Sequence, residues 1–255
     1  MPRKEDYIAV FDSGVGGISV LRQLLKQMPG EKFLYFGDSA NAPYGTRSTE
    51  EIRQLVHDVA QQLLKKGIKA LVVACNTATS AAIDMLRQTY PDLIIVGIEP
   101  AVKLAARLFP GGTIGVMATP VTLREQKFNH LMHNLDDQCT IIKLPIPGLP
   151  ELIEEGKGND PETDALLRPI LEPWSGKLDA VVLGCTHYPF AAQAIRRILG
   201  NNVTLLDGGE GTARETKRRL AQNDLLLEGQ GEVVWESSLP SPDFSIRCQL
   251  LLTQE

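Results

Sequence analysis

The chain has 255 residues, of which 43% are hydrophobic and 22% charged, and its formal net charge is −5. This composition excludes a disordered chain, and the length predicts two domains or one large α/β unit. Four cysteines are too few for a disulfide scaffold. The charge offers no basic excess for nucleic acid, and no apolar run reaches the roughly 18–20 residues of a membrane span. We therefore expect a cytoplasmic enzyme with neither nucleic-acid nor membrane partners.

Short apolar runs alternate with helical patterns along the chain. The apolar runs that predict strands lie at residues 7–11, 33–36, 70–74, 93–98, 113–117, 141–144, 180–183 and 203–206. Apolar residues at helical spacing predict a helix over 18–28, and Ser48 with Glu51 forms a capping box that starts another helix, which ends at Gly67. This alternation predicts a doubly wound α/β fold with mainly parallel sheets.

Two segments repeat in order. Residues 70–77 resemble residues 180–187, and residues 8–13 align loosely with residues 114–119. The repeat has two possible interpretations. Either the segments are alike in composition alone, or the chain folds into two similar pseudo-symmetric lobes. The second interpretation predicts that each lobe is a mainly parallel sheet flanked by helices, with the active site in the cleft between the lobes. The first lobe would hold residues 1–98 and 210–255, with Asp12 and Cys75. The second would hold residues 99–209, with Cys185 and His187.

Polar or reactive residues follow four of the predicted strands, where ligands of α/β sheets bind. These residues are Asp12-Ser13-Gly14, Cys75-Asn76-Thr77, Thr119 and Cys185-Thr186-His187, and the turn Pro43-Tyr44-Gly45 can reach the same edge. A cysteine after a buried strand is often a core residue. Cys75 and Cys185, however, hold the same place in the repeat before an expected helix N-terminus, which lowers a thiol pKa.

Each of the remaining candidate residues has a structural interpretation as well as a catalytic one. Asp12 is either a helix cap or the partner of a thiol, and His187 is either a surface histidine or such a partner. The glycines after Ser13 match no nucleotide-binding fingerprint, so we expect them to form a tight turn that binds a small carboxylate. Cys139 and Cys248 are expected to be structural, and no spacing indicates a metal site.

Four motifs in this order resemble those of bacterial glutamate racemases, of the aspartate/glutamate racemase superfamily. They are Val10-Phe11-Asp12-Ser13-Gly14-Val15-Gly16-Gly17, Pro43-Tyr44-Gly45, Val73-Ala74-Cys75-Asn76-Thr77-Ala78 and Leu183-Gly184-Cys185-Thr186-His187-Tyr188-Pro189. The resemblance runs from about residue 7 to about residue 215 and is weak beyond Asp224. Residues 167–174 look like the Gram-negative branch of the family.

The resemblance implies cofactor-independent interconversion of L- and D-glutamate, which supplies D-glutamate for peptidoglycan. It implies that Cys75 and Cys185 act as the two bases, that Asp12 assists Cys75 and that His187 assists Cys185. One of Glu151, Glu154 and Glu155 would support the second thiol. The implied substrate contacts are Asp12, Ser13, Pro43, Tyr44, Gly45, Asn76, Thr77, Thr119, Thr122, Thr186 and His187. A homodimer is expected, and activation by a cell-wall precursor stays open.

Three alternatives remain. An aspartate racemase or another superfamily member would share the motifs. A carboxylate-binding protein without turnover would keep its affinity after thiol alkylation. A cysteine hydrolase built on Cys185 and His187 fits poorly, because the two residues are only two positions apart. A pyridoxal-phosphate racemase is disfavoured, since no lysine stands in a phosphate-binding context.

Overall fold

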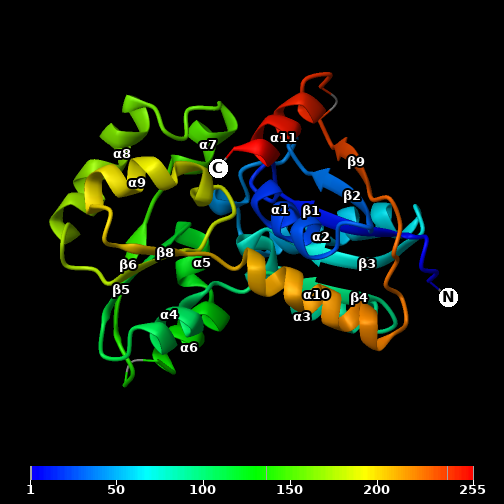
Figure 1. The fold of residues 1–255 in the computed structure, drawn as a ribbon, viewed down its shortest axis with the longest axis horizontal. Coiled ribbons are helices and arrows are strands. Elements are labelled where there is room, and N and C mark those ends of the chain that lie inside the picture. Colours follow the sequence, from blue (N-terminus) through cyan, green and yellow to red (C-terminus); the bar gives the residue numbers. More distant parts are fainter. Residues whose placement is uncertain (1, 136, 240, 255) are drawn as a thin grey trace. The chain divides into compact units, whose positions relative to one another are not determined.

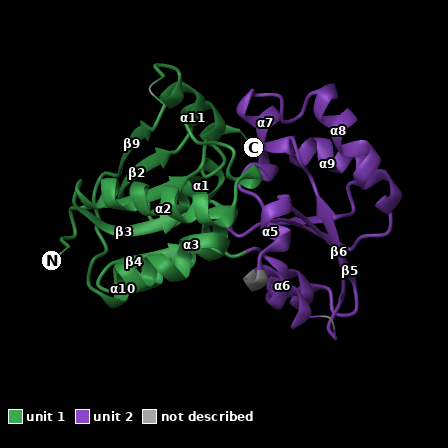
Figure 2. Cartoon of the chain, turned by 180° about the vertical axis from the view of Figure 1, so that it is seen from behind, with its two compact units in different colours: residues 1–99, 209–255 green, residues 100–208 purple. Residues whose placement is uncertain are grey.

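A computed structural model describes residues 2–135, 137–239 and 241–254. The chain divides into two compact units, which are coloured separately in Figure 2. Unit 1 contains Met1–Glu99 and Gly209–Glu255, and unit 2 contains Pro100–Gly208. Each unit is built around one parallel sheet.

The sheet of unit 1 has the strand order β4-β3-β1-β2-β9, with every pair parallel. Its strands are β1 (Tyr7–Asp12), β2 (Lys32–Gly37), β3 (Ile68–Val73), β4 (Ile94–Gly97) and β9 (Glu232–Ser237). The three strands β1, β2 and β3 are buried along nearly their whole length. Such strands read as continuous apolar runs, because helices cover both faces of a parallel sheet.

Helices cover both faces of this sheet. The helices of unit 1 are α1 (Ile18–Gln27), α2 (Thr49–Leu64), α3 (Asn76–Thr89), α10 (Gly209–Gln222) and α11 (Phe244–Thr253). Helix α1 packs on α10 and α11, whereas α2 packs on α3. The strand order with right-handed crossovers places these two groups on opposite faces. A short 3₁₀ turn, η1 (Tyr44–Thr46), lies between β2 and α2.

The sheet of unit 2 has the strand order β6-β5-β7-β8 and is also parallel. Its strands are β5 (Thr113–Ala118), β6 (Thr140–Pro145), β7 (Ala180–Leu183) and β8 (Thr204–Leu206). Its helical segments are α4 (Val102–Leu108), α5 (Pro120–Arg124), α6 (Gln126–His133), α7 (Leu149–Glu154), α8 (Pro161–Leu171), η2 (Glu172–Trp174), η3 (Tyr188–Ala191) and α9 (Ala192–Leu199). Figure 1 shows α4 and α6 on one side of this sheet and α8 and α9 on the other.

The predicted α/β class is confirmed, and each of the eight predicted strands overlaps an observed one. The capping box of Ser48 and Glu51 starts α2, and Gly67 follows it with a φ of 73°. One strand was missed, and one local prediction was wrong. Strand β9 was not expected, because its residues Glu232–Ser237 are only partly buried and carry acidic and hydroxyl groups. In addition, Cys185 is followed by the 3₁₀ turn η3 rather than directly by an α-helix.

Among the described residues, no helix is long and apolar enough to span a membrane.

Candidate active site

The strands that carry the candidate residues end level with one another in each sheet. In unit 1, Asp12 pairs with Gly37 and Phe11 pairs with Val73. In unit 2, Met117 pairs with Leu183. The carboxyl ends of β1, β2 and β3 therefore lie at one edge of the first sheet, and those of β5 and β7 lie at one edge of the second. These are the edges at which parallel sheets bind ligands.

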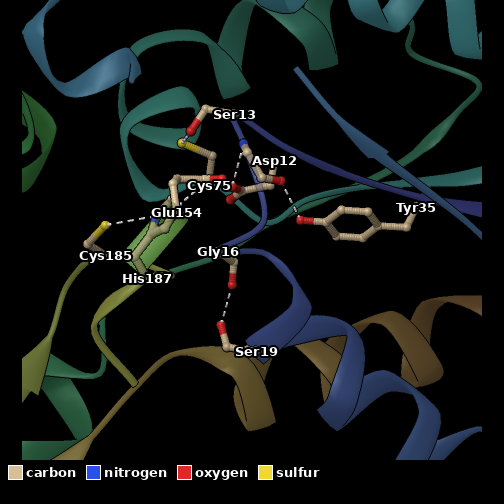
Figure 3. A network of polar contacts seen from close by, with 10 residues as sticks. Asp12, Ser13, Gly16, Ser19, Tyr35, Cys75, Glu154, Cys185 and His187 are labelled. Carbon is tan, nitrogen blue, oxygen red and sulfur yellow. Dashed lines mark hydrogen bonds and ion pairs between the residues drawn. The ribbon is translucent and has the colours of Figure 1, made fainter. Parts of the chain in front are cut away.

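Cys75 is the N-cap residue of α3, and its side chain is buried. The Ala78 N–H donates to Cys75 Sγ at 3.4 Å, and Ser13 Oγ lies 3.7 Å from the same sulfur (Figure 3). The N-terminal amides of a helix carry partial positive charge, which favours a thiolate over a thiol. The predicted helix N-terminus therefore holds at Cys75.

Asp12 ends β1 with no exposed surface, and its Oδ1 accepts the Gly14 N–H at 3.0 Å. It closes the turn rather than capping a helix, because the N-cap residue of α1 is Gly17. A Cβ at Gly17 would come within 2.6 Å of Asp12 Cβ, so only glycine lets α1 start this close to the strand. The Gly14 N–H is therefore occupied by the Asp12 carboxylate. The sequence had predicted that the backbone N–H groups of this turn bind the carboxylate of a ligand.

Asn76 follows Cys75 and is 4% exposed. Neither the oxygen nor the nitrogen of its side-chain amide has a hydrogen-bond partner among the described residues. An unpaired buried amide costs free energy, which a bound polar ligand can recover. Thr77, the next residue, is also buried. The Asn76 amide is thus a buried polar group that the described residues leave unsatisfied.

Asp38 holds the turn Pro43-Tyr44-Gly45 in place through hydrogen bonds. The Tyr44 hydroxyl donates to Asp38 Oδ2 at 2.6 Å, and the Asn41 amide donates to Asp38 Oδ1 at 3.0 Å. Burial and the neighbouring Asp38 carboxylate raise the pKa of Tyr44 far above its usual value of 10.0. Tyr44 therefore keeps its proton at any working pH and acts here as a hydrogen-bond donor.

Cys185 has a different setting. Its Sγ lies 3.7 Å from His187 Nδ1, and His187 Nε2 lies 2.8 Å from Glu154 Oε1 (Figure 3). Glu154 is the last residue of α7, so a helix end delivers the carboxylate to the turn after β7. A sulfur, an imidazole and a carboxylate thus form one hydrogen-bonded row within unit 2.

The charge of His187 follows from these contacts. Burial opposes the charged imidazole, but the hydrogen bonds to Cys185 and Glu154 outweigh it and raise the pKa of His187 well above 6.5. The two contacts therefore favour the protonated form of His187. An imidazolium beside a sulfur stabilises a thiolate directly.

The structure distinguishes the three glutamates left open by the sequence. Glu154 contacts His187, whereas Glu155 pairs with Lys157 at 2.8 Å. Glu151 Oε2 is buried with no hydrogen-bond partner in the described part of the chain, and its charge contributes, after burial and Cys185, to a raised pKa of Tyr188. Glu154 is therefore the carboxylate that reaches the Cys185 row.

The threonines of unit 2 lie at the same sheet edge. Thr119 is the N-cap residue of α5 and accepts the Thr122 N–H at 3.2 Å, and the two hydroxyls are 2.9 Å apart. Thr186, between Cys185 and His187, is buried. The other two cysteines, Cys139 and Cys248, are buried, one directly before β6 and the other within α11, so neither follows a strand as Cys75 and Cys185 do. No cluster of potential metal ligands occurs among the described residues.

Two residues at this edge were missed by the sequence analysis. Tyr35, inside β2, donates its hydroxyl to the Gly14 carbonyl at 2.7 Å, and Asp38 supports Tyr44. The signals were available. Asp38 follows a strand just as Asp12 ends one, and a tyrosine inside an otherwise apolar buried strand needs a partner for its hydroxyl.

These features describe a protein with one buried thiol after a strand of each sheet. Comparisons with known proteins show the family to which such a chain belongs. The profile of the family described as Asp/Glu/Hydantoin racemase matches residues 10–216. The chain belongs to this family, which confirms the prediction of a racemase.

Within the family, the chain is similar to glutamate racemases. It is 50% identical to that of Clostridium acetobutylicum over 230 residues, which are 90% of each chain. A Bacillus anthracis glutamate racemase structure matches with a TM-score of 0.88, 30% identity, and coverage of 99% of this chain and 96% of that one. An Escherichia coli glutamate racemase in complex with L-glutamate and the activator UDP-MurNAc-Ala matches at 0.85, also with 30% identity, over 98% and 94%.

The expected link to the Gram-negative branch is not confirmed, because the curated relatives that match at 45–50% identity come from Clostridium species. Residues 167–174 form the end of α8 and the short η2 turn. They are mostly surface residues at a helix end, where sequence similarity carries little information on branch.

Proposed function

We propose that this chain interconverts L- and D-glutamate without a cofactor, using Cys75 and Cys185 as its two acid/base groups. The observation that carries the proposal is that each sheet ends in a buried thiol with its own proton-handling neighbours. The 50% identity to a glutamate racemase over most of both chains supports glutamate as the substrate.

Racemisation needs two groups, because the two enantiomers present the Cα hydrogen on opposite faces. One thiolate removes the proton, and the thiol on the other face delivers one to the planar intermediate. A thiolate is a suitable base when its surroundings bring its pKa near the working pH. The helix N-terminus favours the thiolate at Cys75, and His187 Nδ1, 3.7 Å from the sulfur, is placed to exchange a proton with Cys185.

The negative charge that develops on the substrate needs preorganised donors. We assign this role to the sequence-predicted contacts at the two sheet edges, which are Ser13, Gly45, Asn76, Thr77, Thr119, Thr122 and Thr186. Asn76 is the best supported, since its buried amide has no partner in the described chain. In this proposal Asp12 accepts or relays a proton near Cys75, and His187 with Glu154 stabilises the Cys185 thiolate.

The test is circular dichroism of L-glutamate incubated with purified protein and no added cofactor. The signal should decay to zero, because free enantiomers have equal energies and an enzyme cannot change their ratio. The reaction should stop in Cys75→Ser and Cys185→Ser variants that keep the wild-type far-UV spectrum. Decay with L-aspartate but not with L-glutamate would indicate the aspartate racemase alternative. Binding of glutamate without any decay would indicate a carboxylate-binding protein.

We also propose the cellular setting that follows from this reaction, namely supply of D-glutamate for peptidoglycan in the cytoplasm by a homodimer. Light scattering tests the dimer. The Escherichia coli relative was solved with an activator, UDP-MurNAc-Ala, so the same compound is the probe for activation here. A rise in kcat/KM on its addition would extend that regulation to this chain, and an unchanged value would exclude it.

A further inference from the structure

The hydroxyl of Tyr35 holds the turn that follows β1. Tyr35 lies inside β2 with no exposed surface, and its hydroxyl donates to the Gly14 carbonyl at 2.7 Å (Figure 3). The Gly14 N–H is bound at the same time by Asp12 Oδ1 at 3.0 Å. Both polar groups of Gly14 are therefore fixed, and one of the two anchors comes from the neighbouring strand.

The ring of Tyr35 is itself held by the C-terminal part of unit 1. Trp235 of β9 lies against it with ring centroids 5.8 Å apart, and Phe244, the first residue of α11, stacks on it at 6.4 Å. Phe244 also packs over Gly37, where an added Cβ would come within 2.8 Å of its ring and of the Gly14 carbonyl. This segment lies outside residues 10–216, which the family profile matches.

We propose that Tyr35 is a positioning residue, which sets Ser13 against Cys75 by fixing the Gly14 carbonyl, and that Trp235 and Phe244 act on the site through the Tyr35 ring. Ser13 directly precedes Gly14, whose N–H and carbonyl are bound by Asp12 and Tyr35, and its Oγ is 3.7 Å from Cys75 Sγ. The part of this proposal that concerns catalysis rests on the proposed function. The part that concerns the Cys75 thiol does not.

The first experiment measures the two thiols separately. Iodoacetamide alkylation of Cys75 and of Cys185 is followed by peptide mass spectrometry in wild-type protein, Tyr35→Phe and Tyr7→Phe. Tyr7 is the matched control, because it is a tyrosine at the start of β1, at the opposite end of the same sheet. In Tyr35→Phe the turn opens more often, so Cys75 should react about three-fold faster or more, while Cys185 keeps its rate. Tyr7→Phe should leave both rates unchanged.

The second experiment measures racemisation. Misplacement of Ser13 should raise KM in Tyr35→Phe and lower kcat/KM about ten-fold in both directions, because small displacements of positioned groups have large kinetic effects. A mere loss of folded protein would lower kcat at an unchanged KM. Phe244→Leu keeps the hydroxyl but loosens the ring, and it should produce the same changes to a smaller extent.

Three results would overturn the proposal. One is a Tyr35→Phe variant with wild-type KM and wild-type alkylation of Cys75. Another is an equal acceleration of Cys75 and Cys185, which would indicate general loosening. The third is an equal effect of Tyr7→Phe. If the wild-type protein does not racemise glutamate, the proposed function fails, and the alkylation rates still decide the role of Tyr35.

Discussion

The turns that begin at Cys75 and Cys185 have similar sequences, but different groups contact the two sulfurs. Each follows a buried parallel strand, and each continues with two polar residues. Cys75 caps a regular helix and receives a backbone N–H at 3.4 Å. Cys185 precedes a 3₁₀ turn and instead has His187 Nδ1 at 3.7 Å.

The difference has a local cause. Asn76, Thr77 and Ala78 continue as α-helix, and the Ala78 N–H donates to the Cys75 sulfur. Pro189 lies one residue beyond the start of η3, and the chain reaches the α-helix α9 only at Ala192. In the described part of the chain, the contact shown for the second sulfur is with a side chain, His187. The same strand–cysteine pattern thus places one sulfur at a helix N-terminus and the other beside an imidazole, and either setting can stabilise a thiolate.

The largest expected effect comes from removing either sulfur. Cys75→Ala and Cys185→Ala should each lower the racemisation rate by about 10³-fold or more, since general acid–base groups contribute about 10²–10⁴-fold. Chiral chromatography of glutamate measures the rates. Cys139→Ala and Cys248→Ala are the matched controls, because both cysteines are buried and neither directly follows a strand. A Cys75→Ala variant with wild-type turnover would contradict the proposal that both thiols act as acid/base groups.

The helper residues should act on different directions of the reaction. By the family resemblance, Cys185 takes the proton from L-glutamate and Cys75 takes it from D-glutamate. His187→Asn should therefore raise the primary isotope effect of α-deuterated glutamate mainly from L to D, and Asp12→Asn mainly from D to L. Each should lower turnover about 10–100-fold, less than loss of the base itself. Initial rates in both directions provide the measurement, and equal isotope effects in both directions for both variants would refute the division.

Glu154 should matter less than the histidine it contacts. Glu154→Gln keeps a hydrogen-bond acceptor for His187 but removes the carboxylate charge, so turnover should fall about ten-fold or less. Glu155→Gln is the matched control, because Glu155 pairs with Lys157 at the surface. Steady-state kinetics of the two variants would show whether the Cys185 row ends at His187 or extends to the carboxylate. Equal activities for both variants would confine the row to the sulfur and the imidazole.

A smaller effect is expected on stability. Because the pKa of His187 is raised in the folded chain, the folded state holds this proton more tightly than the unfolded state. The stabilisation is fully present below about pH 6.5, the unfolded value, and is lost as pH rises through the folded pKa. Urea unfolding from pH 6 to pH 10 should show this loss in wild-type protein and a flatter profile in His187→Asn. Asp12→Asn is the comparison variant, because it leaves the contacts of His187 intact, and it should keep the wild-type slope in this range.

The strands were predictable because buried parallel strands are continuous apolar runs, as at residues 70–74. Strand β9 was not, since an edge strand with Glu232, Glu236 and Ser237 carries no such run. The candidate residues that follow the strands could also be predicted, because polar residues are typical of strand ends and helix caps. What the sequence could not provide was pairing across the fold. The partner of His187 is 33 positions away at Glu154, and the partner of Gly14 is 21 positions away at Tyr35.

The choice among Glu151, Glu154 and Glu155 shows the same limit. All three lie within five consecutive residues, and helical spacing puts Glu151 and Glu154 one turn apart. Only the position of α7 relative to the turn after β7 decides which carboxylate meets His187. That position depends on packing of unit 2 as a whole.

Entry of solvent deuterium tests the two-thiol account most directly. L-glutamate is incubated with the protein in D₂O, and both enantiomers are separated and analysed by mass spectrometry at early turnover. If one thiol removes the proton and the other delivers a solvent-derived one, the D-glutamate formed should carry deuterium while the remaining L-glutamate stays unlabelled. The reverse reaction should give the mirror pattern. Equal early labelling of substrate and product would indicate a single exchanging base and would contradict the account.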